Sequence, residues 1–436
     1  MNKPQLSFWQ IINMNVGFFG IQYSFGLQQT AINPIYSFLH ATPEQLPLLN
    51  LAGPMTGLLI QPIIGAMSDR TWSIRWGRRK PYMLIGAILC SLCLFVYPLS
   101  SSLWMAVGLL WILDAANNTT MEPYRALIAD KLPSNQVPTG FLSQSFFTGL
   151  GITLANVSLY LFQRSIHGSS HSGIPYWVYG SFFIGGIFSI TTVLWSLYRT
   201  KEIPPTEREW VRLKTQPKGF MEPLKDIFVS LKEMPKPMQQ LAVVYLFQWY
   251  ALFCYWQYIS HSIALSVWNT SSELNPELYG EAAGWTGLVN GFYNVVTFLT
   301  AFLLVRFAKK YSARIVHAIC LSLAAISLAI LPSIHNKYYL FAPMVGFGIA
   351  WASIMGVPYI MMLKCIPSKK FGVYMGIINM MIVIPMIIQT LTFGTIFKYV
   401  LNSNPNNAIY FAGAFLLIAS ILVLRITEEK QLEPEE

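Results

Sequence analysis

Long apolar stretches follow one another along the whole of this chain of 436 residues. A helix needs about 20 mostly apolar residues to cross the hydrocarbon core of a membrane. Twelve stretches reach that length, at residues 9–38, 45–68, 81–100, 103–130, 139–163, 175–198, 239–268, 281–305, 312–332, 338–363, 372–398 and 407–425. Charged residues are only 11% of the chain, too few to cover the surfaces of soluble domains of this total length. The sequence therefore predicts an all-α membrane protein with twelve transmembrane helices.

Positive charge predicts which side of the membrane each loop faces. If both tails and every second loop are cytoplasmic, those regions hold 25 of the 29 Lys and Arg residues. Cytoplasmic loops carry such an excess, so we expect both termini in the cytoplasm. The net charge of +10 lies in short clusters between apolar stretches, which argues against a nucleic-acid partner. Short loops and the lack of a cleavable signal peptide favour a bacterial inner membrane.

A polar connection and a faint repeat divide the chain into two halves. The longest polar connection, residues 199–238, predicts an N-terminal half at 1–198 and a C-terminal half at 239–436. The pair Pro123-Tyr124 recurs as Pro358-Tyr359, 235 residues later, in the fourth segment of each half. Transporters commonly consist of such duplicated halves, with the binding site where the halves meet near the bilayer midplane.

The fourth segment carries three charged residues, Asp114, Glu122 and Arg125, inside an expected span. Each costs at least about 2.5–3.5 kcal/mol at that depth, so such groups are usually paired and functional. Asn118 and Arg125 lie only about 40° and 20° round the helix from Asp114, although Arg125 is about 16 Å further along its axis. A substrate could bridge Asp114 and Arg125, or Arg125 could pair with Glu122. Burial favours the protonated form of Asp114, so it is a candidate proton site; a structural hydrogen-bonding role is the alternative.

The first and seventh segments offer groups that suit a neutral polyol. Gln22 and Gln28 lie in the first segment, which has no charge in its middle, and amides both donate to and accept from sugar hydroxyls. Residues 245–258 contain eight aromatic residues among fourteen, including Trp249 and Trp256, whose faces can pack against sugar C–H groups. An interfacial aromatic belt is the alternative, but fourteen helical residues span about 21 Å, too deep for a belt alone.

The loop between the second and third segments holds a specific motif. Residues 65–70 read Gly-Ala-Met-Ser-Asp-Arg, and residues 77–80 read Gly-Arg-Arg-Lys. Asp69 can pair with Arg78 or face a helix N-terminus, so Asp69, Arg70 and Arg78 are candidates for a gating latch between conformations. Positive charge that only sets topology is the alternative. This motif resembles the loop signature of the major facilitator superfamily.

Further segments are similar to plant sucrose–proton symporters and their bacterial disaccharide-transporting relatives; they are residues 20–34, 53–62, 114–119 and 125–130. The resemblance implies a twelve-helix fold of two pseudo-symmetric halves. It also implies alternating access and proton-coupled import of a disaccharide or glucoside such as sucrose or maltose.

The resemblance also implies roles for individual residues. Asp114 would be the proton-coupling carboxylate and Arg125 a buried arginine. Gln22, Gln28 and Asn118 would line the sugar pocket. The partners would be a sugar, a proton and the lipid bilayer, with no cofactor and no obligatory protein partner.

Other proton sites and other functions remain possible from the sequence. Glu122 stands where the plant pattern has a small residue, which makes it a second candidate proton site. By the offset of 235, Asp114 and Arg125 map to Ile349 and Ile360, so proton handling is expected in the first half. A sodium-coupled glycoside symporter of the same fold and a sugar sensor that does not transport remain alternatives. An enzyme or metal site is not expected, because the six histidines are scattered and no phosphate-binding loop is present.

Overall fold

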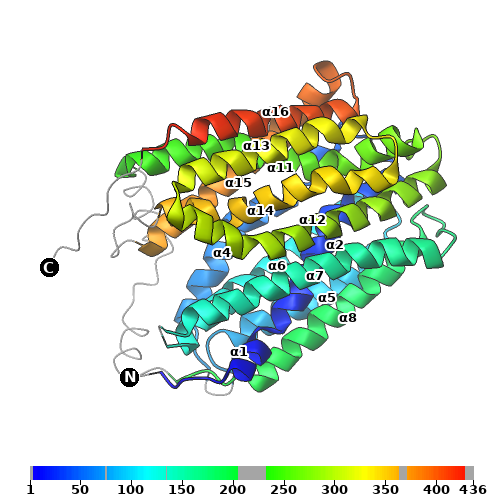
Figure 1. Ribbon diagram of the computed structural model, residues 1–436. Helices are drawn as coiled ribbons and strands as arrows, with labels where there is room; N and C mark the ends of the chain where they lie inside the picture. Colours follow the sequence, from blue (N-terminus) through cyan, green and yellow to red (C-terminus); the bar gives the residue numbers. More distant parts are fainter. Residues whose placement is uncertain (1–2, 74–75, 134, 205–231, 363–370, 428–436) are drawn as a thin grey trace. The chain divides into compact units, whose positions relative to one another are not determined.

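The computed structural model describes residues 3–73, 76–133, 135–204, 232–362 and 371–427, and within these ranges its regular elements are helices (Figure 1). The earlier helices are α1 Phe8–Asn15, α2 Gly17–Phe38, α3 Leu46–Leu49, α4 Ala52–Arg70, α5 Lys80–Val96, η1 Tyr97–Leu99, α6 Leu103–Lys131, α7 Val137–Ser165 and α8 Tyr176–Arg199. The later helices are α11 Lys236–Trp268, α12 Pro276–Lys310, α13 Ala313–Ile330, η2 Leu331–Ser333, η3 Lys337–Leu340, α14 Phe341–Met362, α15 Phe371–Tyr399 and α16 Pro405–Val423.

The predicted membrane fold is confirmed. Each of the twelve expected spans coincides with a helix of at least 17 residues in the described part of the chain. The differences are local: the first span divides into α1 and α2 at Val16, and α12 is longer than expected, at 35 residues.

Four of the long helices are too polar to be identified as membrane spans by hydropathy alone. Within the described residues, eight segments are long and apolar enough to cross a membrane. Of the twelve long helices described, these segments leave out α2, α6, α11 and α12. Three of those four carry the candidate residues Gln22, Asp114 and Trp249. Polar groups inside a membrane protein are costly and usually functional, so low hydropathy marks the helices of interest.

Local sequence explains where α6 begins and where α11 begins and ends, and both helices run unbroken past their candidate residues. Ser102 caps α6 by accepting a hydrogen bond from the Met105 amide, and the helix continues through Pro123 for 29 residues. α11 begins with Pro237 in its first turn and ends at Asn269, which adopts the left-handed conformation. Asp114 and Arg125 therefore share one helix, as the sequence predicts.

The chain forms two compact units. The first unit is Met1–Ala41, Leu49–Pro217 and Ala283–Gly291, and the second is Thr42–Leu48, Lys218–Ala282 and Phe292–Glu436. These units differ from the predicted halves at residues 42–48 and 283–291, and residues 205–231 of the predicted linker lie outside the described residues.

Glycines permit close helix packing around the candidate site in the first unit. A Cβ atom on Gly86 of α5 would lie 2.6 Å from the Ala116 carbonyl oxygen of α6. A Cβ atom on Gly20 of α2 would lie 2.7 Å from the Ser189 Cα of α8. Only glycine allows these helices to approach so closely, which holds α6 firmly against α5 and α2 against α8.

Candidate functional site

Asp114 is buried in the first unit, with only 4% of its surface exposed. The Thr56 side chain of α4 hydrogen-bonds its carboxyl group, and a Cβ on Gly53 would lie 3.2 Å from its Oδ2. Among the described residues this carboxyl has no ion-pair partner. Because an unpaired buried carboxylate is costly, this setting favours the neutral, protonated acid.

Two tyrosines complete the surroundings of Asp114. Tyr36 of α2 and Tyr97 of η1 are fully buried and interact electrostatically with its carboxyl group. The two tyrosine side chains also interact with each other. The sequence offered no signal for either residue, because their approach to Asp114 depends on how three helices pack.

Asn118 links α6 to α4. Its Nδ2 donates to the Asp114 carbonyl oxygen at 3.0 Å and to Thr56 Oγ1 at 3.1 Å. Its Oδ1 accepts from Gln61 Nε2 at 2.7 Å. Both ends of this amide are therefore engaged beside the acid, and a sugar-binding role for Asn118 stays a prediction.

Arg125 lies on a more open part of α6. Its Nη1 is 3.4 Å from Glu122 Oε1, which is the pairing considered from the spacing of the two residues. The implied burial of Arg125 is wrong, because its side chain is 49% exposed and that of Glu122 is 26% exposed. Arg125 pairs with Glu122, three residues earlier on the same helix, and the rest of its guanidinium is accessible. It therefore needs no buried partner to offset its charge.

The two glutamines of α2 differ in how well they are satisfied. Gln22 is buried, and its Nε2 is 4.0 Å from the Met121 sulfur, a weak acceptor. Gln28 Nε2 has no hydrogen-bond partner among the described residues. Both amides thus retain capacity to bind a polar ligand.

In the second unit, Trp249 and Trp256 of α11 are brought together by Trp351 of α14. The ring centroids of Trp249 and Trp351 are 6.1 Å apart, those of Trp256 and Trp351 are 5.5 Å apart, and both pairs meet edge to face. Trp256 and Trp351 are partly exposed, whereas Trp249 is buried. We call these three residues the tryptophan cluster. Trp351 was missed by sequence reasoning, although an indole inside a largely aliphatic span was the available signal.

Buried polar side chains form three further contacts in the second unit. The His317 ring lies 2.9 Å from Ser353 Oγ through Nδ1 and 3.2 Å from Gln248 Oε1 through Nε2. Gln389 Nε2 donates to Gln257 Oε1 at 2.8 Å. None of these residues was predicted, since each becomes notable only through its partner on another helix.

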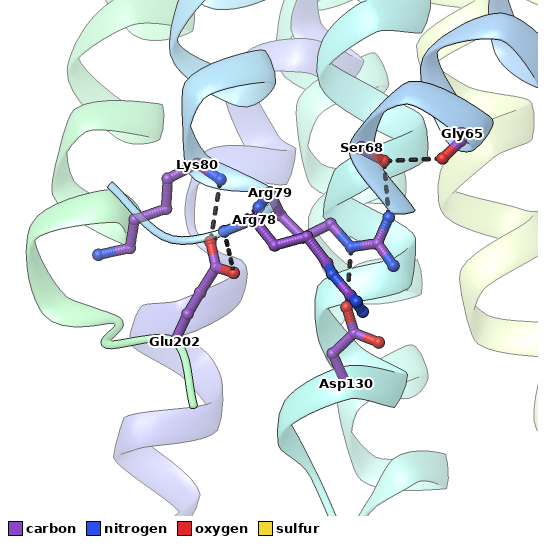
Figure 2. Close-up of polar contacts among 7 residues, drawn as sticks. All are labelled: Gly65, Ser68, Arg78, Arg79, Lys80, Asp130 and Glu202. Carbon is purple, nitrogen blue, oxygen red and sulfur yellow. Dashed lines mark hydrogen bonds and ion pairs between the residues drawn. The ribbon is translucent and has the colours of Figure 1, made fainter. Parts of the chain in front are cut away.

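The loop between α4 and α5 is held by a carboxylate from the end of α8 (Figure 2). Glu202 accepts from the backbone amides of Arg78, Arg79 and Lys80 at 2.8, 2.9 and 3.0 Å. These amides open α5, where a helix leaves donors unpaired and favours negative charge. A side chain on Gly77, which has a φ of 77°, would collide with the Glu202 carboxylate.

Arg79 links this loop to two other helices. Its Nε donates to Asp130 Oδ2 of α6 at 2.8 Å, and its Nη1 donates to Ser68 Oγ of α4 at 2.6 Å. Arg79 is only 4% exposed and makes this contact between helices, which the sequence did not predict. A gating role for Arg78 stays a prediction. The side chains of Asp69 and Arg70 lie outside what the structure describes, so their gating role stays a prediction.

Comparison with known families identifies the fold. The family model described as Major Facilitator Superfamily matches residues 14–390 of the chain. The chain belongs to the Major Facilitator Superfamily. It is therefore a multi-pass membrane transporter and not an enzyme.

Two plant sucrose transport proteins are similar to this chain over most of their length. The sucrose transport protein SUT5 of Oryza sativa subsp. indica is 24% identical over 467 residues, covering 93% of this chain and 85% of SUT5. The sucrose transport protein SUC4 of Arabidopsis thaliana is 25% identical over 422 residues, covering 86% of this chain and 81% of SUC4.

Solved structures of the superfamily fold are also similar. The nucleoside transporter NupG matches with a TM-score of 0.67 at 12% identity, covering 96% of this chain and 100% of NupG. The D-xylose–proton symporter matches with a TM-score of 0.66 at 16% identity, covering 98% of this chain and 100% of that chain. At these identities the structures establish the shared fold.

Proposed function

We propose that this protein is a proton-coupled symporter that imports a disaccharide or glucoside of the sucrose class by alternating access. The observation that carries the proposal is Asp114, a buried acid with no ion-pair partner among the described residues. The similarity to named sucrose transport proteins supports the substrate class. The similarity of fold to a D-xylose–proton symporter agrees with proton coupling.

Proton binding at Asp114 changes the balance between conformations. The charged carboxylate is disfavoured where it is buried, so a conformation that buries it is stabilised when a proton is bound. Thr56 contacts both the Asp114 carboxyl and the Asn118 amide, which joins the protonation state to the α4–α6 packing. Glu122, paired with the accessible Arg125, is a second candidate proton site.

Sugar recognition uses amides and aromatic rings. Within the first unit, Gln22 and Gln28 are candidate sugar-binding amides. Within the second unit, the tryptophan cluster is a candidate surface for sugar C–H groups. Lys and Arg distribution supports cytoplasmic termini, and we place the transporter in a cell membrane of the bacterial inner-membrane type. The proposal requires no cofactor and no protein partner.

Uptake into proteoliposomes tests the function. Purified protein is given radiolabelled sucrose or maltose, and either an inward proton gradient or an inward sodium gradient is imposed. We expect accumulation with the proton gradient and its loss with a protonophore. Accumulation driven by sodium instead would identify a sodium symporter, and binding without any transport would identify a sensor.

A further inference from the structure

Gln257 of α11 and Gln389 of α15 form a buried amide pair within the second unit. Their side chains are 1% and 0% exposed and are joined by the hydrogen bond from Gln389 Nε2 to Gln257 Oε1. Gln389 Nε2 also contacts the Cys254 sulfur at 3.5 Å. The other ends, Gln257 Nε2 and Gln389 Oε1, have no hydrogen-bond partner among the described residues.

The two free ends always form one donor and one acceptor. The amide orientation of a glutamine can be reversed, but the internal hydrogen bond requires one nitrogen and one oxygen to face each other. Whichever way the pair is turned, one NH₂ group and one carbonyl oxygen are left over. A hydroxyl group both accepts and donates, so its chemistry suits both ends.

Buried polar atoms without partners are rare in native proteins and need an explanation. Two apolar side chains of similar size would fill the same space without leaving unpaired polar atoms. Gln257 follows Trp256 directly in α11, so the pair lies at the same level along this helix as Trp256, with Gln257 about 100° round its axis from that residue.

We propose that the Gln257–Gln389 pair binds one specific hydroxyl group of the transported saccharide. This inference rests on the proposed sugar transport and adds a hydrogen-bonding subsite between α11 and α15, at the same level along α11 as Trp256. The pair selects a sugar by the position of that hydroxyl, because a buried site built for a hydroxyl rejects an analogue that lacks it.

Uptake of sucrose, maltose and their monodeoxy analogues by proteoliposomes tests the subsite. For the wild-type protein we expect one deoxy position to raise KM by roughly tenfold or more. In Gln257→Leu and in Gln389→Leu, KM for the parent sugar rises by a similar factor and the penalty for that one analogue disappears. The double variant is no worse than either single variant, because both residues bind the same hydroxyl.

Matched variants separate the outcomes. Gln239→Leu makes the same change at the exposed start of α11 and should leave every KM unchanged. If a leucine variant does not reach the membrane, Gln257→Asn and Gln389→Asn withdraw the amide by one methylene and test the same loss. Sugar uptake with an unchanged pattern of analogue penalties would show that the pair holds only water, which overturns the inference and leaves the proposed function intact. A wild-type protein that moves none of these sugars overturns both.

Discussion

Two buried polar groups, Asn118 in the first unit and the Gln257–Gln389 pair in the second, differ in how fully their hydrogen bonds are satisfied. In the first unit the Asn118 amide is satisfied at both ends beside Asp114. In the second unit Gln257 and Gln389 each keep one end without a described partner. A polar network whose donors and acceptors all have partners holds one geometry, whereas buried polar atoms without partners can bind a ligand. The contrast agrees with the proposed roles of Asp114 in proton binding and of Gln257–Gln389 in hydroxyl binding, while the open Gln28 amide also leaves the first unit able to contact a sugar.

The chemistry of each task explains the contrast. A proton site works best where surroundings stay dry and fixed, so that gain or loss of one charge changes the energy strongly. A site for a neutral polyol needs unsatisfied donors and acceptors near apolar faces. The pseudo-repeat agrees with this division, since the counterparts of Asp114 and Arg125 are Ile349 and Ile360.

The largest expected effect comes from removing the acid. With one proton per sugar, a gradient of two pH units can drive about 100-fold accumulation, because each unit is worth about 1.4 kcal/mol. Asp114→Asn should reduce this to no accumulation while sugar exchange between the two sides continues. Glu273→Gln removes an exposed carboxylate and serves as the control. Undiminished proton-driven accumulation in Asp114→Asn would break the comparison between the units.

The next effect concerns the tryptophan cluster. Trp351→Ala removes the ring that both Trp249 and Trp256 contact, so the aromatic surface offered to the sugar is lost. We expect KM for sugar to rise about tenfold, since lost aromatic contacts are worth about 1 kcal/mol or more. The accumulation ratio at saturating sugar should be kept. Trp104→Ala, at a tryptophan that is 75% exposed, is the control.

Much of this architecture could be predicted from sequence. Apolar length gives the twelve helices, and the isolated charges of α6 point to Asp114. These signals are local, because a charge inside a membrane raises the free energy whichever helices pack against it. The i, i+3 spacing was also sufficient to suggest the Glu122–Arg125 pair, though not the exposure of Arg125.

The rest depends on contacts between helices distant in the chain. Gln389 and His317 are single polar residues in apolar spans, and their importance comes from Gln257 and Gln248 on α11. In the loop motif, sequence reasoning chose Arg78, but packing turns Arg79 towards Asp130 and Ser68. Neighbouring arginines in a loop are equivalent in sequence until the fold orients them.

A smaller effect is expected from His317, which hydrogen-bonds the Gln248 amide in the second unit. His317 bonds one end of the Gln248 amide, and Gln248 Nε2 has no partner among the described residues. His317→Phe should let this amide rotate, and we expect KM for sugar to rise about threefold, the loss of a hydrogen bond worth about 0.5–1 kcal/mol. His317→Gln, which can still bond Gln248, should restore most of the affinity. An unchanged KM in His317→Phe would limit the sugar site to other residues.

The smallest expected effect lies away from both ligand sites, at the Glu202 carboxylate. Glu202→Gln keeps one acceptor for the amides of Arg78–Lys80 but loses the charge at the start of α5, which should lower the free energy of unfolding by about 0.5–1 kcal/mol. Thermal unfolding of the detergent-solubilised protein measures this change, and Glu273→Gln, at an exposed turn before α12, is the control. Sugar KM should be unchanged, because a helix cap acts on the fold of the first unit. A large change in KM with no change in unfolding would instead assign Glu202 to the transport cycle.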